Sequence, residues 1–505
     1  MTISTRIKPN LYKDSVALMR IAEKLLADPA ITRATLVMAT PANKDILKEA
    51  GLLADEADRA SPSDLIIVIE AANAAAAATA YALTDTSLVG GSQAGLSGQS
   101  GEPKEIAAKT ITMGLPRLDG ANLAQISVPG AYAGAEALKA VKAGLNVFLF
   151  SDNVPLEEER TVKQLAQKKG LLVMGPDCGT AIIGGVPLGF ANVVRRGRIG
   201  VIGASGTGLQ EVTSQIHLMG AGVSHAIGTG GRDVKAEIGG STMLMALDLL
   251  ASDAATDVIG IVSKPPAPEV MREVIARAGR AGKPVVVVFL GGAAMELAAN
   301  VHQTHNLFDC AAQCVALATG RKPLVGDALE TLSSKTVGGQ RFLRGLFSGG
   351  TFCTEAQVAL QSLGIQSFSN VPLDKLLKLK NLNQSEQHTM LDLGDDDFTV
   401  GKPHPMIDPS TRIARIAQEA ADPQTAALLI DIVLGYAGHV DPAGALSQAI
   451  LQAKAKRDLP VIAFVCGTEE DPQVRSKQEA ELKAAGCVVA SSSTHAAQMA
   501  AQLVA

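Results

Sequence analysis

A glycine-rich turn between a strand-like run and a helix-like run constrains the fold of this chain most. It lies within residues 198–219, RIGVIGASGTGLQEVTSQIHLM. Residues 199–202 form a short apolar run typical of a buried strand, and Leu209, Val212 and Ile216 recur at helical spacing. The intervening glycines allow backbone amides to converge, and the helix behind them adds its positive end. This combination predicts a strand–turn–helix unit that attracts an anion.

The sequence leaves two interpretations of this turn open. GASGTG lacks the lysine of a P-loop and the full dinucleotide fingerprint, so neither nucleoside triphosphate nor NAD binding follows from it. The turn is either an anion site or only a tight connection between a strand and a helix.

The same pattern occurs a second time at residues 341–355, RFLRGLFSGGTFCTE. Comparable apolar runs follow each copy, so we expect two α/β domains of one type. Two such domains usually pair about a pseudo-twofold axis, and we expect the two turns to face each other and hold one anion between them. The predicted anion-binding residues are Ser205, Gly206, Thr207, Gly208, Ser348, Gly349, Gly350 and Thr351.

A glutamate follows each turn. Glu211 and Glu355 come four residues after Thr207 and Thr351, the threonines predicted to cap the two helices. A carboxylate at this position is favoured by the positive end of the helix, so helix stabilisation alone could explain it. We predict instead that both glutamates are catalytic and spared from structural duty.

The first third of the chain alternates strand-like and helix-like patterns. Strand candidates occupy residues 34–40, 65–70, 123–128, 146–150 and 171–175. This alternation predicts a parallel sheet covered by helices on both faces, which is a doubly wound domain.

Polar loops follow several apolar runs. SDNVP at 151–155 and MGPDCGT at 174–180 lie at the carboxyl ends of predicted strands, where ligands of open α/β sheets bind. LDLGDDDF at 391–398 carries three aspartates that can hold Mg²⁺ or cap the next helix. The candidate cofactor or substrate ligands are Asp152, Asn153, Asp177, Cys178, Asp395 and Asp396.

Composition narrows the classes of partner. The net charge is −5, aromatic residues make up 3% and tryptophan is absent, which argues against nucleic acid as a partner. We find no run like a signal peptide or a membrane span, and the six cysteines are scattered, so we expect a reduced, cytoplasmic protein. HQTHNLFDCAAQC at 302–314 lacks the usual zinc spacing, and we predict a packed helix face with no metal.

Several motifs carry a family resemblance. NVFLFSDNVP, MGPDCGTAI, RRGRIGVIGASGTGLQE, IGTGGRD and KPVVVVFLGG resemble the α subunit of succinyl-CoA synthetase, and residues 341–505 resemble the C-terminal ligase domain of its β subunit. Together with SKPPAP, RGLFSGGT and LDLGDDDFT, they resemble the FdrA family of predicted acyl-CoA synthetases. The resemblance implies an α/β fold with a Rossmann-like CoA-binding-type domain at 1–192 and two flavodoxin-like ligase domains at 193–325 and 336–505.

The resemblance also implies roles for individual residues. Ser205, Gly206 and Thr207 would border a phosphate site, and Glu211 matches the glutamate that contacts a phosphorylated histidine in the α-subunit family. The Gly-His-Ala-Gly loop of that family is replaced here by GGAAMELAANVHQTH, and no glycine flanks His302 or His305.

Members resembling FdrA are associated with purine and allantoin catabolism. The implied reaction is that of an oxamate carbamoyltransferase complex, which converts oxalurate and phosphate to oxamate and carbamoyl phosphate without ATP or a histidine nucleophile. The alternatives are a succinate–CoA ligase type of acyl-CoA synthetase and a non-catalytic subunit that binds CoA or an anion. CoA and Mg²⁺ are the cofactors considered, and partner subunits and an oligomer are expected. Because no Walker loop or ATP-grasp segment occurs, we predict no tight nucleotide binding.

Overall fold

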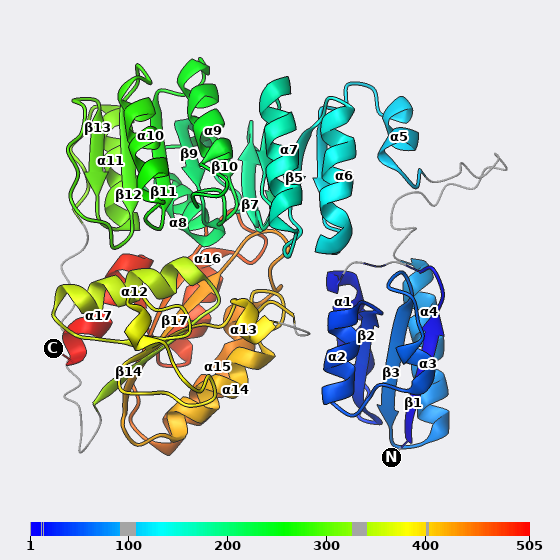
Figure 1. Cartoon of the computed structure of the whole chain (residues 1–505). Coiled ribbons are helices and arrows are strands. Elements are labelled where there is room, and N and C mark those ends of the chain that lie inside the picture. Colours follow the sequence, from blue (N-terminus) through cyan, green and yellow to red (C-terminus); the bar gives the residue numbers. More distant parts are fainter. Residues whose placement is uncertain are drawn as a thin grey trace. The chain divides into compact units, whose positions relative to one another are not determined.

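The computed structural model describes residues 2–11, 13, 15–90, 108–325, 341–399 and 403–504 (Figure 1). The chain divides into two compact units. The first contains residues 1–108 and 399–403, and the second contains residues 109–398 and 404–505. The two units are considered separately below.

The first unit contains an antiparallel sheet with the strand order β1-β3-β2. Strand β3 is buried and lies between β1 and β2, which therefore run parallel to each other on either side of it. The elements are β1 (Thr2–Lys8), α1 (Ser15–Leu26), β2 (Ile31–Met38), α2 (Pro41–Glu49), α3 (Asp55–Asp58), β3 (Leu65–Ala71) and α4 (Ala74–Gly90).

This topology corrects the prediction of one parallel, doubly wound sheet through the first third of the chain. A helical crossover makes the strands before and after it run parallel. It does not determine whether those two strands pair directly or whether a third strand lies between them. Here β3 is inserted, and it pairs antiparallel with both neighbours. Alternation of strand and helix patterns is the same in both topologies, so the sequence pattern did not distinguish them.

The second unit begins with a three-stranded parallel sheet of order β4-β5-β6. Its strands are three of those predicted to be parallel, and their direction is confirmed. The elements are α5 (Ile111–Gly114), η1 (Leu115–Arg117), β4 (Leu123–Ile126), α6 (Gly130–Lys142), β5 (Asn146–Leu149), α7 (Leu156–Lys169) and β6 (Val173–Met174).

A seven-stranded sheet of order β13-β12-β11-β9-β10-β7-β8 follows. Strands β9 to β13 pair in parallel, while the hairpin β7–β8 joins β10 in antiparallel direction. The elements are β7 (Thr180–Ile183), β8 (Val186–Gly189), β9 (Arg196–Gly203), α8 (Gly206–Leu218), β10 (Val223–Gly228), α9 (Ser241–Ser252), β11 (Val258–Ser263), α10 (Pro268–Gly279), β12 (Val285–Phe289), β13 (Val301–Thr304) and α11 (Leu307–Thr319).

The last sheet has six strands in the order β15-β16-β14-β17-β18-β19, all parallel. The elements are β14 (Phe342–Phe347), α12 (Gly350–Ser362), β15 (Phe368–Ser369), η2 (Lys375–Leu377), β16 (Thr389–Asp392), α13 (Asp396–Thr399), α14 (Ser410–Ala421), β17 (Thr425–Val433), α15 (Pro442–Lys456), β18 (Val461–Cys466), α16 (Arg475–Ala484), β19 (Val488–Ala490) and α17 (Ser493–Val504).

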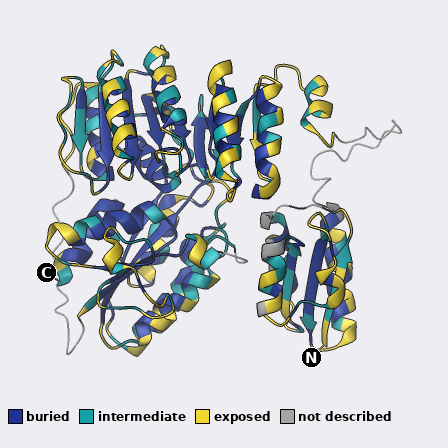
Figure 2. Cartoon of the chain, viewed as in Figure 1, coloured by how far each residue is buried: buried dark blue, intermediate teal, exposed yellow. Residues whose placement is uncertain are grey.

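The two larger sheets share one hydrophobic core. Leu209 and Ile216 of α8 belong to the same buried cluster as Phe352 and Ala356 of α12. Helix α8 also packs on α11, and α12 packs on α17. These helices are dark blue where the two sheets meet in Figure 2. The α/β class with parallel sheets is thereby confirmed, while the predicted boundaries at residues 192 and 336 stay predictions.

None of the helices in the described ranges is both long and apolar enough to cross a bilayer.

Candidate functional site

The first glycine-rich turn connects β9 to α8. Ser205 is the N-cap of α8, and its Oγ accepts a hydrogen bond of 3.3 Å from Gly208 N. Thr207 lies inside the helix, so its prediction as the cap is wrong. The helix begins two residues earlier than predicted, because the extended backbone of Ser205 lets its side-chain oxygen reach an amide of the first turn. No described residue accepts a hydrogen bond from the backbone N–H of Gly206 or Thr207.

The second turn is occupied from within the protein. The carboxylate of Asp431, a fully buried residue of β17, accepts hydrogen bonds from Ser348 N at 2.9 Å, Gly349 N at 3.0 Å and Ser348 Oγ at 2.8 Å. Arg412 donates to the same carboxylate at 2.8 Å. The two amides predicted to bind an external anion already bind this aspartate. Gly349 is the N-cap of α12, so Thr351 is not the cap either.

The two turns face each other, as their duplication led us to expect. Ser205 Oγ and Thr351 Oγ1 form a short hydrogen bond. A Cβ on Gly349 would lie 2.8 Å from Thr207 Cγ2, and one on Gly208 would lie 3.3 Å from Thr351 Cγ2. Because the helix starts are in direct contact, the space midway between them is filled. An anion would have to bind to one side of this contact.

A pocket lies beside the first turn. A Cβ on Gly206 would point toward Thr180 Oγ1 at 3.1 Å, so the turn faces the start of β7. The pocket is a cavity of about 10 Å³, which is room for about one water molecule. Its lining residues are Asp177, Cys178, Gly179, Thr180, Gly203, Ala204, Ser205, Gly206, Gly228 and Gly230. The predicted loop at 174–180 and the first turn are therefore brought together.

Carboxylates from three segments influence one another near this pocket. Desolvation, together with the charges of Asp152 and Asp396, raises the pKa of Asp177 to about 6 although the residue keeps exposed surface. Burial and the charge of Asp152 also raise the pKa of Asp396. Arg232 opposes the shift at Asp177. Within the described ranges, no three or more His, Cys, Asp or Glu side chains converge as a metal site requires, and Mg²⁺ stays a prediction.

The other predicted ligands have different surroundings. Cys178 is buried, and burial raises the pKa of its thiol to about 12, so it stays protonated near neutral pH. Asn153 follows β5 with a positive φ of 51°. Its backbone oxygen would lie 2.6 Å from a Cβ on Gly130. Burial raises the pKa of Asp395, whose oxygen accepts a hydrogen bond from Asp397 N at 3.1 Å.

Both predicted catalytic glutamates hold helix ends. Glu211 Oε1 accepts from Ser493 N at 3.1 Å, and Glu355 Oε1 accepts from Leu307 N at 2.9 Å and Thr494 Oγ1 at 2.8 Å. Each glutamate thus binds the first turn of the last helix of the other large sheet, α17 for Glu211 and α11 for Glu355. The expectation that they are spared from structural duty is wrong, because both are buried between the two sheets. Their catalytic role stays a prediction.

Burial also affects the protonation of these two groups. Burial, with a smaller contribution from the charge of Glu211, raises the pKa of Glu355 to about 7 against its hydrogen bonds from Leu307, Ser493 and Thr494. Burial raises the pKa of Glu211 as well, against a hydrogen bond from Ser493 and the charge of Arg475. The hydrogen-bond partners of the two carboxylates do not include His302 or His305, which lie in and just after β13.

Two further carboxylates at the second turn escaped the sequence analysis. Asp431 interrupts the apolar run of β17, and a charge inside such a run is a signal that could have found it. Asp392 ends β16 and is 8% exposed. A Cβ on Gly350 would overlap Oδ2 of Asp392, so this carboxyl lies over the first residue of α12. Burial raises the pKa of Asp392 to about 7.

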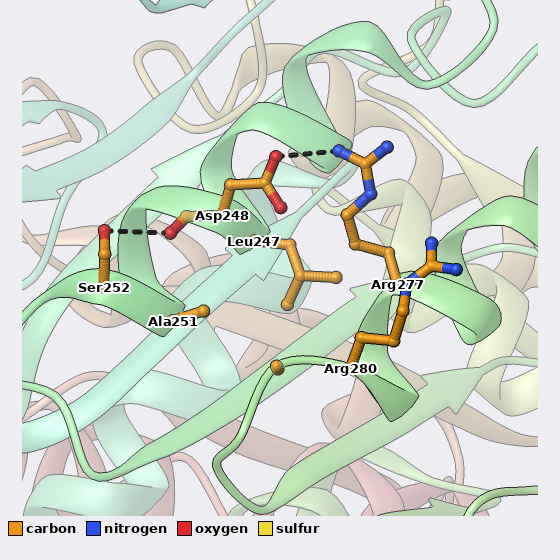
Figure 3. A pocket seen from close by; sticks show the side chains of 7 residues that line it. Leu247, Asp248, Ala251, Ser252, Arg277 and Arg280 are labelled. Carbon is orange, nitrogen blue, oxygen red and sulfur yellow. Dashed lines mark hydrogen bonds and ion pairs between the residues drawn. The ribbon is translucent and has the colours of Figure 1, made fainter.

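A larger surface pocket lies elsewhere, between α9 and α10 (Figure 3). Arg277 Nη1 and Asp248 form an ion pair of 2.7 Å at its rim, and Leu247 forms part of its floor. It shares no lining residue with the pocket beside the first turn. Its charged groups are already paired, and we assign no chemistry to it.

Three family models match the chain. Residues 346–503 match the CoA-ligase model, and residues 194–292 match the CoA binding domain model. Residues 1–104 match a model described as AllF, heavy metal-associated domain. The CoA-binding match thus begins after the region 1–192 to which we had assigned a CoA-binding-type domain. These matches support the involvement of CoA.

The structure allows a test of CoA at the first turn. The free amides of Gly206 and Thr207 suit a phosphate oxygen. The adjoining pocket of about 10 Å³ is far smaller than the roughly 300–1,000 Å³ typical of sites for drug-sized ligands. The described residues at the turn therefore offer amide donors to a single phosphate oxygen, and they do not enclose a whole CoA molecule.

The domain name at the N-terminus raises the question of a metal. Residues 1–104 contain neither cysteine nor histidine. These side chains are the usual ligands of zinc and copper sites in proteins. The residues present therefore do not fit the metal chemistry that the name of the domain suggests.

Curated proteins similar to this chain are of two kinds. YahF of Escherichia coli K12, an uncharacterized protein, is 42% identical over 100% of this chain and 99% of its own length. The ADP-forming sulfoacetate–CoA ligase subunit SauD of Bilophila wadsworthia is 29% identical over 34% of this chain and 60% of its own length. The α subunit of ADP-forming succinate–CoA ligase from Aquifex aeolicus is 29% identical over 29% of this chain and 48% of its own length. The chain thus spans 60% of the length of the first of these ligase subunits and 48% of the length of the second.

Solved structures resemble the fold more distantly. Dinucleotide-forming acetyl-CoA synthetase 1 of Ca. Korarchaeum cryptofilum aligns over 80% of this chain and 86% of its own, with 17% identity and a TM-score of 0.35. That score is too low to support residue-level comparison. The full-length similarity and the domain matches are sufficient, however: the chain belongs to the family of YahF, which combines an AllF-type N-terminal domain with CoA-binding and CoA-ligase domains related to succinate–CoA ligase.

Proposed function

We propose that this chain is an FdrA-like subunit of an enzyme that transfers a carbamoyl group between nitrogen and phosphate. The reaction would convert oxalurate and phosphate to oxamate and carbamoyl phosphate. The observation that carries the proposal is the first turn, which offers two free amides beside a small pocket while the helix starts are closed against each other. A phosphohistidine relay has no matching histidine loop here, and phosphorolysis needs none.

The chemistry suits such a turn. A phosphate oxygen attacks the carbamoyl carbon, the bond from this carbon to the amide nitrogen breaks, and the proton of hydrogen phosphate ends on the leaving nitrogen. Negative charge develops on the carbamoyl oxygen in the transition state. The amides of Gly206 and Thr207 and the positive end of α8 would bind an oxygen of the attacking phosphate and stabilise the negative charge that develops beside it.

The setting follows from the resemblance to FdrA and agrees with the AllF-type match of residues 1–104. We propose a cytoplasmic enzyme in allantoin catabolism, assembled with partner subunits into an oligomer. The six cysteines are free thiols buried in the protein, which suits a reducing compartment.

A second candidate is acyl-CoA ligation, favoured by the CoA-ligase and CoA-binding matches. In this case a nucleotide-dependent step would depend on a partner subunit, because the chain carries no nucleotide-binding motif that we recognise. The same first turn would then hold the phosphate of an acyl phosphate.

Product analysis distinguishes the two candidates. The purified chain, alone and with the products of neighbouring genes, is supplied with oxalurate and phosphate, or with an acyl acid, CoA and ATP. We expect carbamoyl phosphate in the first mixture without ATP. Formation of a CoA thioester only, and only with ATP, would support the ligase instead.

A glycine substitution tests the turn itself. Gly206→Val places a branched side chain against Thr180 and should abolish carbamoyl phosphate formation, together with the rise in melting temperature that phosphate causes in the parent. Gly438→Val, where a Cβ has no neighbour closer than 3.6 Å, is the control. Unchanged phosphate stabilisation in Gly206→Val would remove the first turn from the mechanism.

A further inference from the structure

Two charged side chains flank the contact between the turns without pairing to each other. Lys264 follows β11, the neighbour of β9 in the seven-stranded sheet, and Ala204 N donates to Val262 O at 3.1 Å. This bond places the start of the Lys264 loop against the residue before Ser205. Asp392 ends β16, the neighbour of β14 in the other sheet, and lies in register with Phe347. The two residues thus approach the contact from opposite sheets.

Asp392 keeps one oxygen uncommitted. Its Oδ1 accepts a hydrogen bond of 3.0 Å from Gly394 N, while Oδ2 accepts none in the described part of the chain. Oδ2 lies over Gly350 at the start of α12, where only a glycine leaves it room. Oδ2 is not among the fully buried side-chain atoms that lack a partner, so it keeps some accessible surface and can be reached by a small ligand.

Lys264 is similarly uncommitted. It is exposed and forms no ion pair with any described residue. Its positive charge nevertheless acts to lower the pKa of Asp392, Asp395 and the Cys353 thiol, so it lies close to all three. The lysine and the carboxyl group of Asp392 therefore influence each other without forming an ion pair in the described part of the chain.

We propose that Lys264 and Asp392 act together on the substrate: Lys264 binds the anionic phosphate, and Asp392 carries the proton from hydrogen phosphate to the leaving nitrogen. The proposal rests on the carbamoyl transfer proposed above and deepens it. Asp392 takes the phosphate proton on Oδ2 as the phosphorus-bound oxygen attacks the carbamoyl carbon. It returns this proton to the nitrogen as the carbon–nitrogen bond breaks. Atoms and charge balance, and no oxidant, reductant or nucleotide is needed.

The charges around Asp392 support this role. Burial is the main cause of its pKa of about 7; the charges of Asp395 and Asp431 raise it and that of Lys264 lowers it. A group that titrates near the working pH is suited to both halves of a proton transfer. Asp431 is occupied by the second turn and Arg412, which leaves Asp392 as the group with a free oxygen.

The first test uses phosphate alone and does not require the reaction. The titration of Asp392 is followed in the full chain by NMR of ¹³C-labelled aspartate carboxyl groups, and Asp392→Asn identifies its signal. Inorganic phosphate bound beside Asp392 should raise this pKa, because a second negative charge disfavours the carboxylate. Lys264→Met should abolish the phosphate effect. Lys168→Met, at an exposed lysine of α7, should leave it intact.

The second test uses activity. Asp392→Asn should lower carbamoyl phosphate formation about 100-fold or more, the usual scale for loss of a proton-transfer group, and remove the titration near pH 7 from the rate profile. Lys264→Met should raise KM for phosphate. Asp397→Asn, at an exposed aspartate of the nearby helix α13, should retain activity.

The two tests separate this proposal from the proposed reaction. If phosphate stabilises the parent protein but leaves the Asp392 pKa unchanged, the pairing of Lys264 with Asp392 is wrong whatever the reaction. If the phosphate effect appears as expected and only CoA thioester is formed, Lys264 and Asp392 form an anion site and the proton transfer to nitrogen is wrong. A normal rate profile in Asp392→Asn would also overturn the proton transfer.

Discussion

At the scale of single residues, the recurring feature is a carboxyl group moved out of water. Glu355 and Asp392 both reach a pKa of about 7, and in both burial is the main cause. Their surroundings differ. Glu355 accepts hydrogen bonds on both oxygens, whereas Oδ2 of Asp392 has no partner among the described residues. The first arrangement holds helices in place, and the second leaves a group able to react.

The raised pKa of Glu355 predicts a stability that depends on pH. Since the folded pKa of about 7 lies above the ordinary value of 4.5, the folded state binds the proton more tightly than the unfolded chain. The stabilisation is fully present below about pH 4.5 and is lost as pH rises through 7. Each unit of difference corresponds to about 1.4 kcal/mol, as an order of magnitude.

Glu355→Gln tests this dependence. Glutamine keeps the neutral shape and an acceptor for Leu307 N, so we expect the variant to lose less stability than the parent between pH 5 and pH 8. The measurement is denaturant unfolding at several pH values. Glu296→Gln, at an exposed position, should follow the parent. Equal losses in Glu355→Gln and the parent would show that Glu355 does not titrate in this range.

At the scale of elements, the two strand–turn–helix units have the same outline but different occupants. The first is capped by its own Ser205, and the second is held by Asp431 from a neighbouring strand. An internal carboxylate at the second helix start takes the place that an anion would have. The duplication therefore yields one open turn and one closed turn.

The closed turn predicts a strong coupling between Asp431 and Arg412. Both are buried, so removing one charge leaves the other uncompensated, at a cost of about 3–5 kcal/mol. Asp431→Asn keeps an acceptor for the turn and should be destabilised on this scale. The double variant Asp431→Asn, Arg412→Met should be less destabilised than the single one. Chemical unfolding of the parent, Asp431→Asn, Arg412→Met and the double variant measures the coupling free energy between the two side chains.

The exposed pair of Arg277 and Asp248 is the matched control. Its ion pair of 2.7 Å lies at the surface, where such pairs contribute roughly 0–1 kcal/mol. Arg277→Met and Asp248→Asn should therefore combine with little coupling. If Asp431 and Arg412 also combine additively, the closed turn does not depend on their pairing.

Features that depend on residues close together in the sequence could be predicted, whereas features that depend on distant residues could not. The turn at 203–208 and its copy were found because glycine spacing and helical periodicity are local. The cap at Ser205 was missed by two residues, since which side chain reaches the helix amides depends on backbone angles. The roles of Asp431, Ser493 and Leu307 depend on contacts between residues far apart in the chain, and no local pattern encodes those.

At the scale of the whole molecule, the two large sheets form one body through reciprocal contacts. Glu211 reaches the last helix of the second sheet, and Glu355 reaches the last helix of the first. A shared hydrophobic core surrounds these contacts. Each glutamate accepts a hydrogen bond from a backbone amide at the start of a helix that belongs to the other sheet. Relative motion of the two sheets would therefore break these bonds and leave both the carboxyl group and the helix start without a partner. The open turn is therefore held in a fixed position against its closed copy.

The last prediction concerns metal. Residues 1–104 match a heavy metal-associated model yet contain neither cysteine nor histidine, so this domain should bind no stoichiometric zinc or copper. In the second unit, Cys310 and Cys314 are fully buried on one face of α11. The hydrogen bond with Cys310, together with burial, raises the pKa of Cys314 well above its ordinary value. A thiol that resists ionisation is a poor ligand, because zinc binds the thiolate. Elemental analysis of the purified full chain should therefore find no zinc or copper in stoichiometric amount. Finding one metal ion per chain would contradict the prediction. If that metal were lost in the Cys310→Ser, Cys314→Ser double variant, the site would lie in α11. If the double variant kept the metal, other residues would be its ligands.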